Sequence, residues 1–168
     1  MLAALLTTAI LAAQAAHPLA PFQGTWTGDM HSFGADYPTT LMSLTVEPTE
    51  AEGELTWTIR YGDTDVRPYV IRPVEGAEGA FEIDEKNSIV LPARLFGEEE
   101  SGHCLVSAFA VEPNGLVAIY RVEGDRMTFT VITLANDRAS TTGGEGQSPE
   151  VLTGPAKTMQ YAVLERAD

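Results

Sequence analysis

The chain has 168 residues, and its 24 Asp and Glu against 10 Lys and Arg give a formal net charge of −14. Such an acidic surface repels phosphate backbones, so we expect no nucleic-acid partner. The single cysteine, Cys104, excludes an internal disulfide framework. The length suits one domain with a substantial core, and no repeat or composition shift marks a second domain.

Residues 1–16 carry no charge and consist almost entirely of Leu, Ala, Ile and Thr; the first charged residue of the chain is Asp29. Small residues around Ala15 and Ala16 offer a cleavage site, so the segment has the pattern of a secretory signal peptide. We therefore expect export to the periplasm or the exterior, a short leader at 17–22 and a barrel domain at 23–168. The alternatives are a buried N-terminal helix or a membrane anchor. The run is shorter than the roughly 20 residues of a span, and we expect no transmembrane segment in the mature chain.

Alternation of apolar and polar residues between turn-forming residues predicts ten short strands and no helix. The dipeptides Asn114-Gly115 and Gly124-Asp125 are strong hairpin signals. Short, evenly spaced strands joined by tight turns predict antiparallel neighbours in an all-β sandwich or barrel. The expected strands are 23–31, 39–47, 54–61, 66–74, 79–84, 87–95, 103–111, 115–122, 125–134 and 156–166.

The segment from Ala135 to Pro155 interrupts this rhythm, with Gly143, Gly144 and Gly146 near its centre. It holds too few apolar residues to pack on itself, and long loops in compact domains are usually functional or disordered. The two interpretations are a mobile surface loop and a lid over the open end of a barrel.

Strand parity assigns a set of aromatic residues to the interior. Trp57 and Tyr61 alternate with Thr58 and Arg60, so they share the inward face. Tyr69 and Tyr120 take the inward side of their strands by the same rule. Aromatic walls with several hydroxyl groups are suited to a small amphipathic ligand.

Arg67 has the parity of Tyr69 and therefore points inward with it. A cation inside a small barrel needs a carboxylate, ordered water or a ligand. Asp65, two residues earlier on the same face, can supply a structural ion pair. The other interpretation is an arginine that binds the carboxylate of a ligand.

The Gly24-Thr25-Trp26 start, the antiparallel strand order and the terminal Arg166 resemble the calycin group of lipocalins, fatty-acid-binding proteins and their exported bacterial relatives. The resemblance implies a single up-and-down β-barrel of about ten strands. It also implies that Arg166 lies across the Trp26 indole at the closed end, a structural role. The chain departs from these families because only 32–38 separate the first two strands, too few for a helical pair, and no C-terminal helix follows Arg166.

No HxH, HExxH or Gly-x-Ser-x-Gly motif occurs, so the sequence identifies no catalytic residue, metal site or cofactor. The leading hypothesis is an exported barrel that binds a small hydrophobic or amphipathic ligand through Trp57, Tyr61, Arg67, Tyr69 and Tyr120. A second hypothesis is a structural or interaction barrel filled by its own side chains, and a third is a barrel-shaped enzyme. The oligomeric state is not predicted.

Overall fold

The computed structural model describes residues 17–98 and 102–167, so the predicted signal peptide at 1–16 lies outside the described residues. The strands of the first half are β1 (Gly24–Phe33), β2 (Thr40–Val46), β3 (Leu55–Tyr61), β4 (Asp65–Pro73), β5 (Ala80–Asp84) and β6 (Val90–Glu98). Those of the second half are β7 (Gly102–Val111), β8 (Asn114–Glu123), β9 (Arg126–Ala135), β10 (Ser140–Gly143), β11 (Glu150–Thr153) and β12 (Ala156–Arg166).

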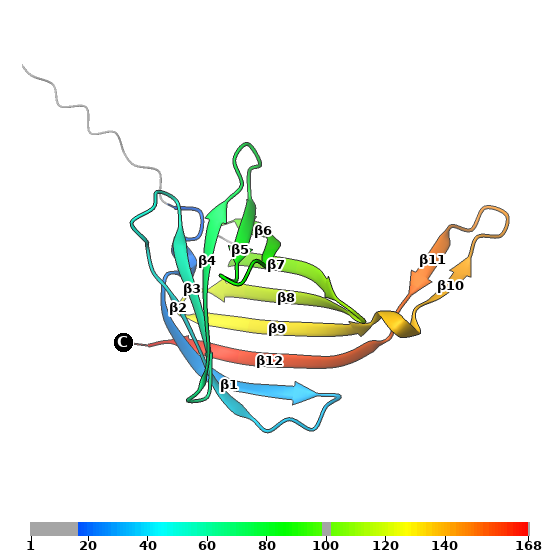
Figure 1. Cartoon of the computed structure of the whole chain (residues 1–168), viewed down its shortest axis with the longest axis horizontal. Helices are drawn as coiled ribbons and strands as arrows, with labels where there is room; N and C mark the ends of the chain where they lie inside the picture. The colour runs from blue at the N-terminus through cyan, green and yellow to red at the C-terminus, as the bar shows by residue number, and fades with distance from the viewer. Residues whose placement is uncertain (1–16, 99–101, 168) are drawn as a thin grey trace, which may run out of the picture.

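Ten of these strands form a closed antiparallel barrel in the order β1-β12-β9-β8-β7-β6-β5-β4-β3-β2. Chain neighbours are sheet neighbours throughout, except that β12 returns between β9 and β1 and closes the barrel. The predicted all-β, up-and-down barrel is therefore confirmed. Figure 1 shows the barrel as two crossing halves, with β1, β12, β9, β8 and β7 running across the view and β2 to β4 running steeply over them.

The segment between β9 and β12 differs from the expected irregular loop. It forms a second, two-stranded sheet in which Thr141 pairs with Leu152 and Thr142 pairs with Val151. All residues of both strands are exposed, and the hairpin projects away from the barrel (Figure 1). Backbone pairing and the hydrogen bonds between Ser140 and Thr153 hold this segment together. A search for apolar residues that could pack on one another does not detect such a hairpin.

One end of the barrel is closed by the residues just before β1. A single 3₁₀ turn, η1 (Ala20–Phe22), places Leu19 and Phe22 in the core with no exposed surface. The ring of His17 accepts from the Leu19 backbone N–H at 3.0 Å and contacts the Gly53 carbonyl oxygen at 3.1 Å. The sequence places these residues in a leader ahead of the domain, whereas in the structure they belong to its core.

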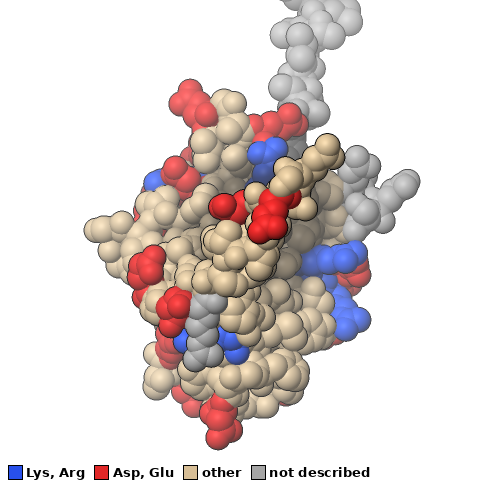
Figure 2. Space-filling view, turned by 90° about the vertical axis from the view of Figure 1, so that its right-hand side faces the viewer, with Lys and Arg blue, Asp and Glu red and all other residues tan. Residues whose placement is uncertain are grey.

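Acidic side chains are spread over the face in Figure 2, while the basic ones gather in fewer places. The pattern agrees with the net charge of −14. Among the described residues, no helix combines the length and the apolar composition that crossing a membrane requires.

Candidate ligand-binding cavity

The structure brings Trp26 and Arg166 together at the closed end. They are register partners on β1 and β12, and the guanidinium carbon lies 4.1 Å from the centre of the indole ring. Arg166 also donates to the carbonyl oxygens of Gln23 and Pro21 and pairs with Asp125 at 3.2 Å. The Trp26 Nε1–H donates to the Phe22 carbonyl oxygen at 2.8 Å. Every polar group of this cluster has a partner, so the end is sealed.

The opposite end of the barrel holds an internal cavity of about 140 Å³. Its lining includes all five residues that the sequence assigned to a ligand: Trp57, Tyr61, Arg67, Tyr69 and Tyr120. They come from β3, β4 and β8, and strand alternation turns each toward the interior. The barrel is thus filled at one end and hollow at the other.

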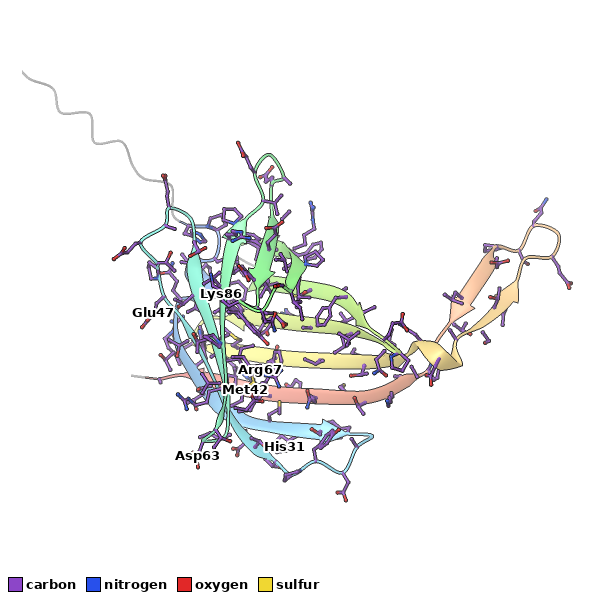
Figure 3. The ribbon with its side chains drawn as sticks, in the orientation of Figure 1. His31, Met42, Glu47, Asp63, Arg67 and Lys86 are labelled. Carbon is purple, nitrogen blue, oxygen red and sulfur yellow. The ribbon has the colours of Figure 1, made fainter. Side chains whose placement is uncertain are left out.

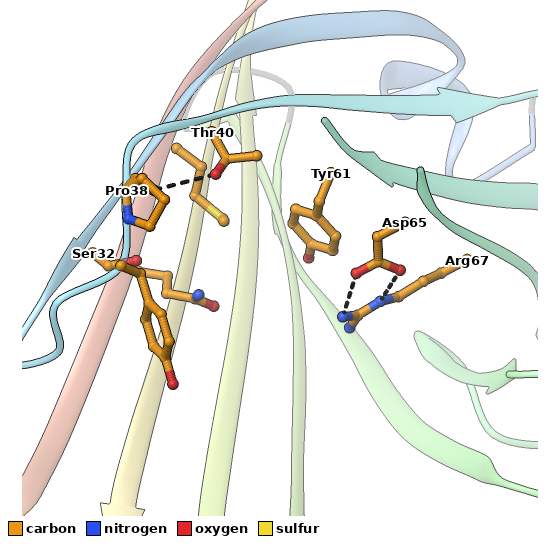
Figure 4. Close-up of a pocket in the computed structure, with 9 residues that line it drawn as sticks. Ser32, Pro38, Thr40, Tyr61, Asp65 and Arg67 are labelled. Atoms are coloured by element: carbon orange, nitrogen blue, oxygen red, sulfur yellow. Dashed lines mark hydrogen bonds and ion pairs between the residues drawn. The ribbon is translucent and has the colours of Figure 1, made fainter. Parts of the chain in front are cut away.

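A second cavity of about 250 Å³ lies at the mouth, beside the β1–β2 connection, and is drawn in Figure 4. Ser32, Tyr37 and Pro38 line its outer side. Tyr61, Arg67 and Gln160 line both cavities, so the two spaces meet at these three side chains. Neither volume alone reaches the roughly 300 Å³ at which ligand pockets usually begin, but a molecule that spans both has that space.

Arg67 lies where the two cavities meet, and its partner is Asp65. Its Nε and one terminal nitrogen donate to the two carboxylate oxygens at 3.3 and 2.9 Å (Figure 4). This bond raises the pKa of Arg67 and holds the pKa of Asp65 below its usual value. The guanidinium carbon also lies 4.8 Å from the centre of the Tyr61 ring. Figure 3 places Arg67 within the outline of the barrel, whereas Asp63 lies in the turn at its edge.

Aromatic rings form the inner wall of the cavity. The Trp57 and Tyr120 rings meet edge to face at 5.1 Å, and Tyr120 packs against Phe129 at 4.8 Å. Burial raises the pKa of Tyr61 to about 12 and raises those of Tyr120 and Tyr69 as well. Their hydroxyl groups therefore stay protonated at neutral pH and can donate hydrogen bonds as well as accept them.

Two side-chain polar atoms are buried without a hydrogen-bond partner among the described residues, Trp57 Nε1 and Ser32 Oγ. Trp57 has no exposed surface and lines the inner cavity, while Ser32 lines the cavity at the mouth. Leaving a buried donor unpaired costs about 1–3 kcal/mol, and native proteins rarely tolerate it without a reason. Both residues line cavities, but the two atoms themselves are closed off from solvent, and the Trp57 N–H lies close enough to the Tyr120 hydroxyl to lower its pKa.

Sequence reasoning missed two residues of this site. Ser32 was expected to follow the first strand, but β1 continues to Phe33 and turns Ser32 inward. Gln160 shares the inward parity of Ala162 and Leu164 on β12, which is the signal that could have identified it. A polar residue such as Gln160 inside an otherwise apolar barrel strand is easily overlooked.

The described residues contain no group of three or more His, Cys, Asp or Glu side chains that could hold a metal ion. A comparison with protein-family models finds no match, and a comparison with curated proteins finds none either. The barrel and the geometry of its open end are therefore the features from which a function can be inferred.

Proposed function

We propose that this protein binds a small amphipathic molecule in the open end of its barrel. The observation that carries the proposal is the inner cavity of about 140 Å³, which Trp57, Tyr61, Arg67, Tyr69 and Tyr120 line together. A hydrogen-bond acceptor on the ligand, such as a carbonyl or hydroxyl oxygen, would meet the protonated hydroxyl groups of Tyr61 and Tyr69 in the lining. The body of the ligand would then lie against Tyr120 and Phe129, which gives it an apolar environment.

The outer end of the ligand would meet polar groups. Arg67, Ser32 and Gln160 lie at or beyond the junction of the two cavities. Asp65 occupies Nε and one terminal nitrogen of Arg67, which leaves donors on the other terminal nitrogen for a ligand oxygen. Asp65 neutralises part of the guanidinium charge. The protein should therefore bind an acid more tightly than its neutral analogue only through the charge that Asp65 leaves unbalanced.

The size of the cavities narrows the ligand class. Volumes of about 140 and 250 Å³ suit a medium-chain fatty acid or a single-ring aromatic acid better than a retinoid. A barrel without a ligand, filled by its own side chains, is the competing hypothesis. Side chains fill the closed end of the barrel, so the hypothesis of a filled barrel describes that half of the molecule but not the open end.

The test is a titration of the protein with octanoic acid, 4-phenylbutyric acid, retinoic acid and the matching amides, followed by Trp fluorescence. We expect saturable quenching by the smaller compounds, and Trp57→Phe should weaken binding of acids and amides alike. Arg67→Met should weaken the acids alone. The matched control is Arg72→Met, because Arg72 lies on the same strand and pairs with Glu82 at 3.3 Å but lines neither cavity.

The absence of saturable binding across this panel, together with no small molecule retained in native mass spectra of the purified protein, would contradict the proposal. Binding that Trp57→Phe and Arg72→Met weaken equally would contradict the location of the site.

We propose further that the protein is exported. The proposal rests on the uncharged apolar segment 1–16 and the small residues at its end. Intact-mass measurement of protein from the native host tests it, with cleavage near Ala15 or Ala16 as the expected result. Retention of residues 1–16 would contradict it.

A further inference from the structure

The outer surface of the barrel differs between its two halves. On β2 to β5 the outward positions combine polar and charged pairs, such as Ser43 with Arg60 and Arg72 with Glu82, with isolated apolar residues such as Leu41 and Val66. On the open-end half of β8, β9 and β12 the outward positions are mostly apolar as well, with Val117, Ile119, Ile132, Met159 and Tyr161, whereas the outward face of β1 is polar except for Phe33. A strand that is apolar on both faces is typical of a sheet buried on both sides, yet here one side faces solvent.

The outward residues of these strands follow from the register. Leu116, Ala118, Phe129 and Val131 line the inner cavity, so their chain neighbours point outward. One row across the sheet is Val117, Ile132, Met159 and Phe33, joined by direct cross-strand pairs. The next row is Ile119, Thr130, Tyr161 and His31. Phe33 is 54% exposed and Met159 38%.

Charged residues border this apolar face on the side of the closed end. Arg126 of β9 pairs in register with Glu165 of β12, and both are exposed. Arg121 on β8 and Asp29 on β1 lie one row nearer the apolar face and are also exposed. Exposed basic residues thus lie on β8 and β9, together with Glu123 of β8, and exposed acidic residues lie on β12 and β1.

We propose that this outer face of β8, β9, β12 and β1 is an interface between two copies of the chain. A twofold axis parallel to the strands, between β9 and β12, places β9 of one copy over β12 of the other and β8 over β1. Arg126 then faces Glu165 of the second copy, and Arg121 faces Asp29. The same operation sets the small Val117 against the large Phe33.

A hollow on the basic side gives the partner's carboxylates a place to bind. It has a volume of about 150 Å³ and is lined by Arg121, Glu123, Arg126 and Thr128. Arg121 is paired with Glu123, whereas Arg126 forms no ion pair with a described residue. Arg126 is therefore available to Glu165 of the second copy.

The size of the face is compatible with a stable dimer. Four strands about 4.8 Å apart and four outward rows about 6.8 Å apart cover roughly 500 Å². Side chains at the border extend this toward the roughly 800 Å² that each partner of a standard interface buries. A lipid surface is less suited, because carboxylates border the face and the net charge of −14 opposes anionic membranes.

Sedimentation equilibrium of the purified full-length chain over a concentration series tests the interface. We expect a dimer that Ile132→Glu converts to a monomer, whereas Thr58→Glu, at an outward position of β3, leaves it intact. Arg126→Glu and Glu165→Arg should each raise the dissociation constant about tenfold, and the double variant should restore it. Circular dichroism of each variant separates loss of association from loss of folding.

A chain that stays monomeric at every concentration would overturn the proposal, as would a dimer that Thr58→Glu disrupts and Ile132→Glu does not. If the monomeric protein instead floats with phosphatidylcholine–phosphatidylglycerol vesicles, and Ile132→Glu abolishes the flotation, the face binds lipid and the proposal is also overturned.

Discussion

Each end of the barrel contains a buried tryptophan and an arginine, but the two tryptophans differ in their hydrogen bonding. At the closed end Trp26 lies under Arg166, and its Nε1–H donates to the Phe22 carbonyl oxygen. At the open end Trp57 is equally buried, but its Nε1–H has no partner among the described residues. The first tryptophan completes a packed seal, while the second lines a cavity of about 140 Å³ with its N–H beside the Tyr120 hydroxyl. The comparison separates a tryptophan that is hydrogen-bonded in the packed end from one that lines a cavity.

The largest expected effect is at the closed end. Trp26→Ala should lower the free energy of unfolding by about 3–5 kcal/mol, because it removes a fully buried indole and its hydrogen bond. Arg166→Ala should cost about 1–3 kcal/mol through lost stacking and hydrogen bonds. Urea denaturation of both variants and the double variant measures the coupling. Because the groups touch, the costs should not add; strict additivity would show that the seal does not act as a unit.

A matched pair of conservative variants compares the two tryptophans directly. Trp26→Phe leaves the Phe22 carbonyl oxygen without its donor, whereas Trp57→Phe removes a donor that already lacks an acceptor. Trp26→Phe should therefore be the more destabilising change, by about 1–2 kcal/mol. Equal losses in urea denaturation would mean that Trp57 has an acceptor in solution.

The fold could be predicted more completely than the site. Every barrel strand was anticipated within a few residues, because alternation is imposed by one buried face and turns are marked by Gly, Asn and Asp. The inward direction of Trp57 and Arg67 followed from parity alone. Parity cannot show how much of an interior remains empty, because that depends on how side chains from strands distant in sequence fill it. The role of Leu19 in the closed end was hidden for the same reason, since its packing partners lie far along the chain.

The tyrosines of the open end predict a dependence of stability on alkaline pH. Burial raises the pKa of Tyr61 from 10.0 in the unfolded chain to about 12. Its contribution is fully present below pH 10 and is lost as the pH rises toward 12, because the unfolded chain releases its proton first. Urea denaturation across this range should show the decline, and Tyr61→Phe should reduce it. If the stability of Tyr61→Phe declines as much as that of the unchanged protein, groups other than Tyr61 cause the decline.

The smallest expected effect concerns Arg67 and Asp65. Both side chains are about half exposed, so breaking their pair with Arg67→Met should cost at most about 1 kcal/mol. The pKa of Asp65 is lowered by this bond, so the contribution is present above the ordinary aspartate pKa and is lost as the pH falls through its lower value in the folded state. Urea denaturation at neutral and acidic pH checks this. If Arg67→Met lowers the free energy of unfolding as much as Arg166→Ala does, Arg67 is a structural residue.

The central claim is that the open end binds a ligand through Trp57 while the closed end does not respond. The chain has only two tryptophans, so a ¹⁵N-labelled sample gives two indole N–H signals, which Trp57→Phe assigns. On titration with octanoic acid, 4-phenylbutyric acid and their amides, the Trp57 signal should shift in a saturable way while the Trp26 signal stays in place. If no compound moves the Trp57 signal, or if only the Trp26 signal moves, the account is contradicted.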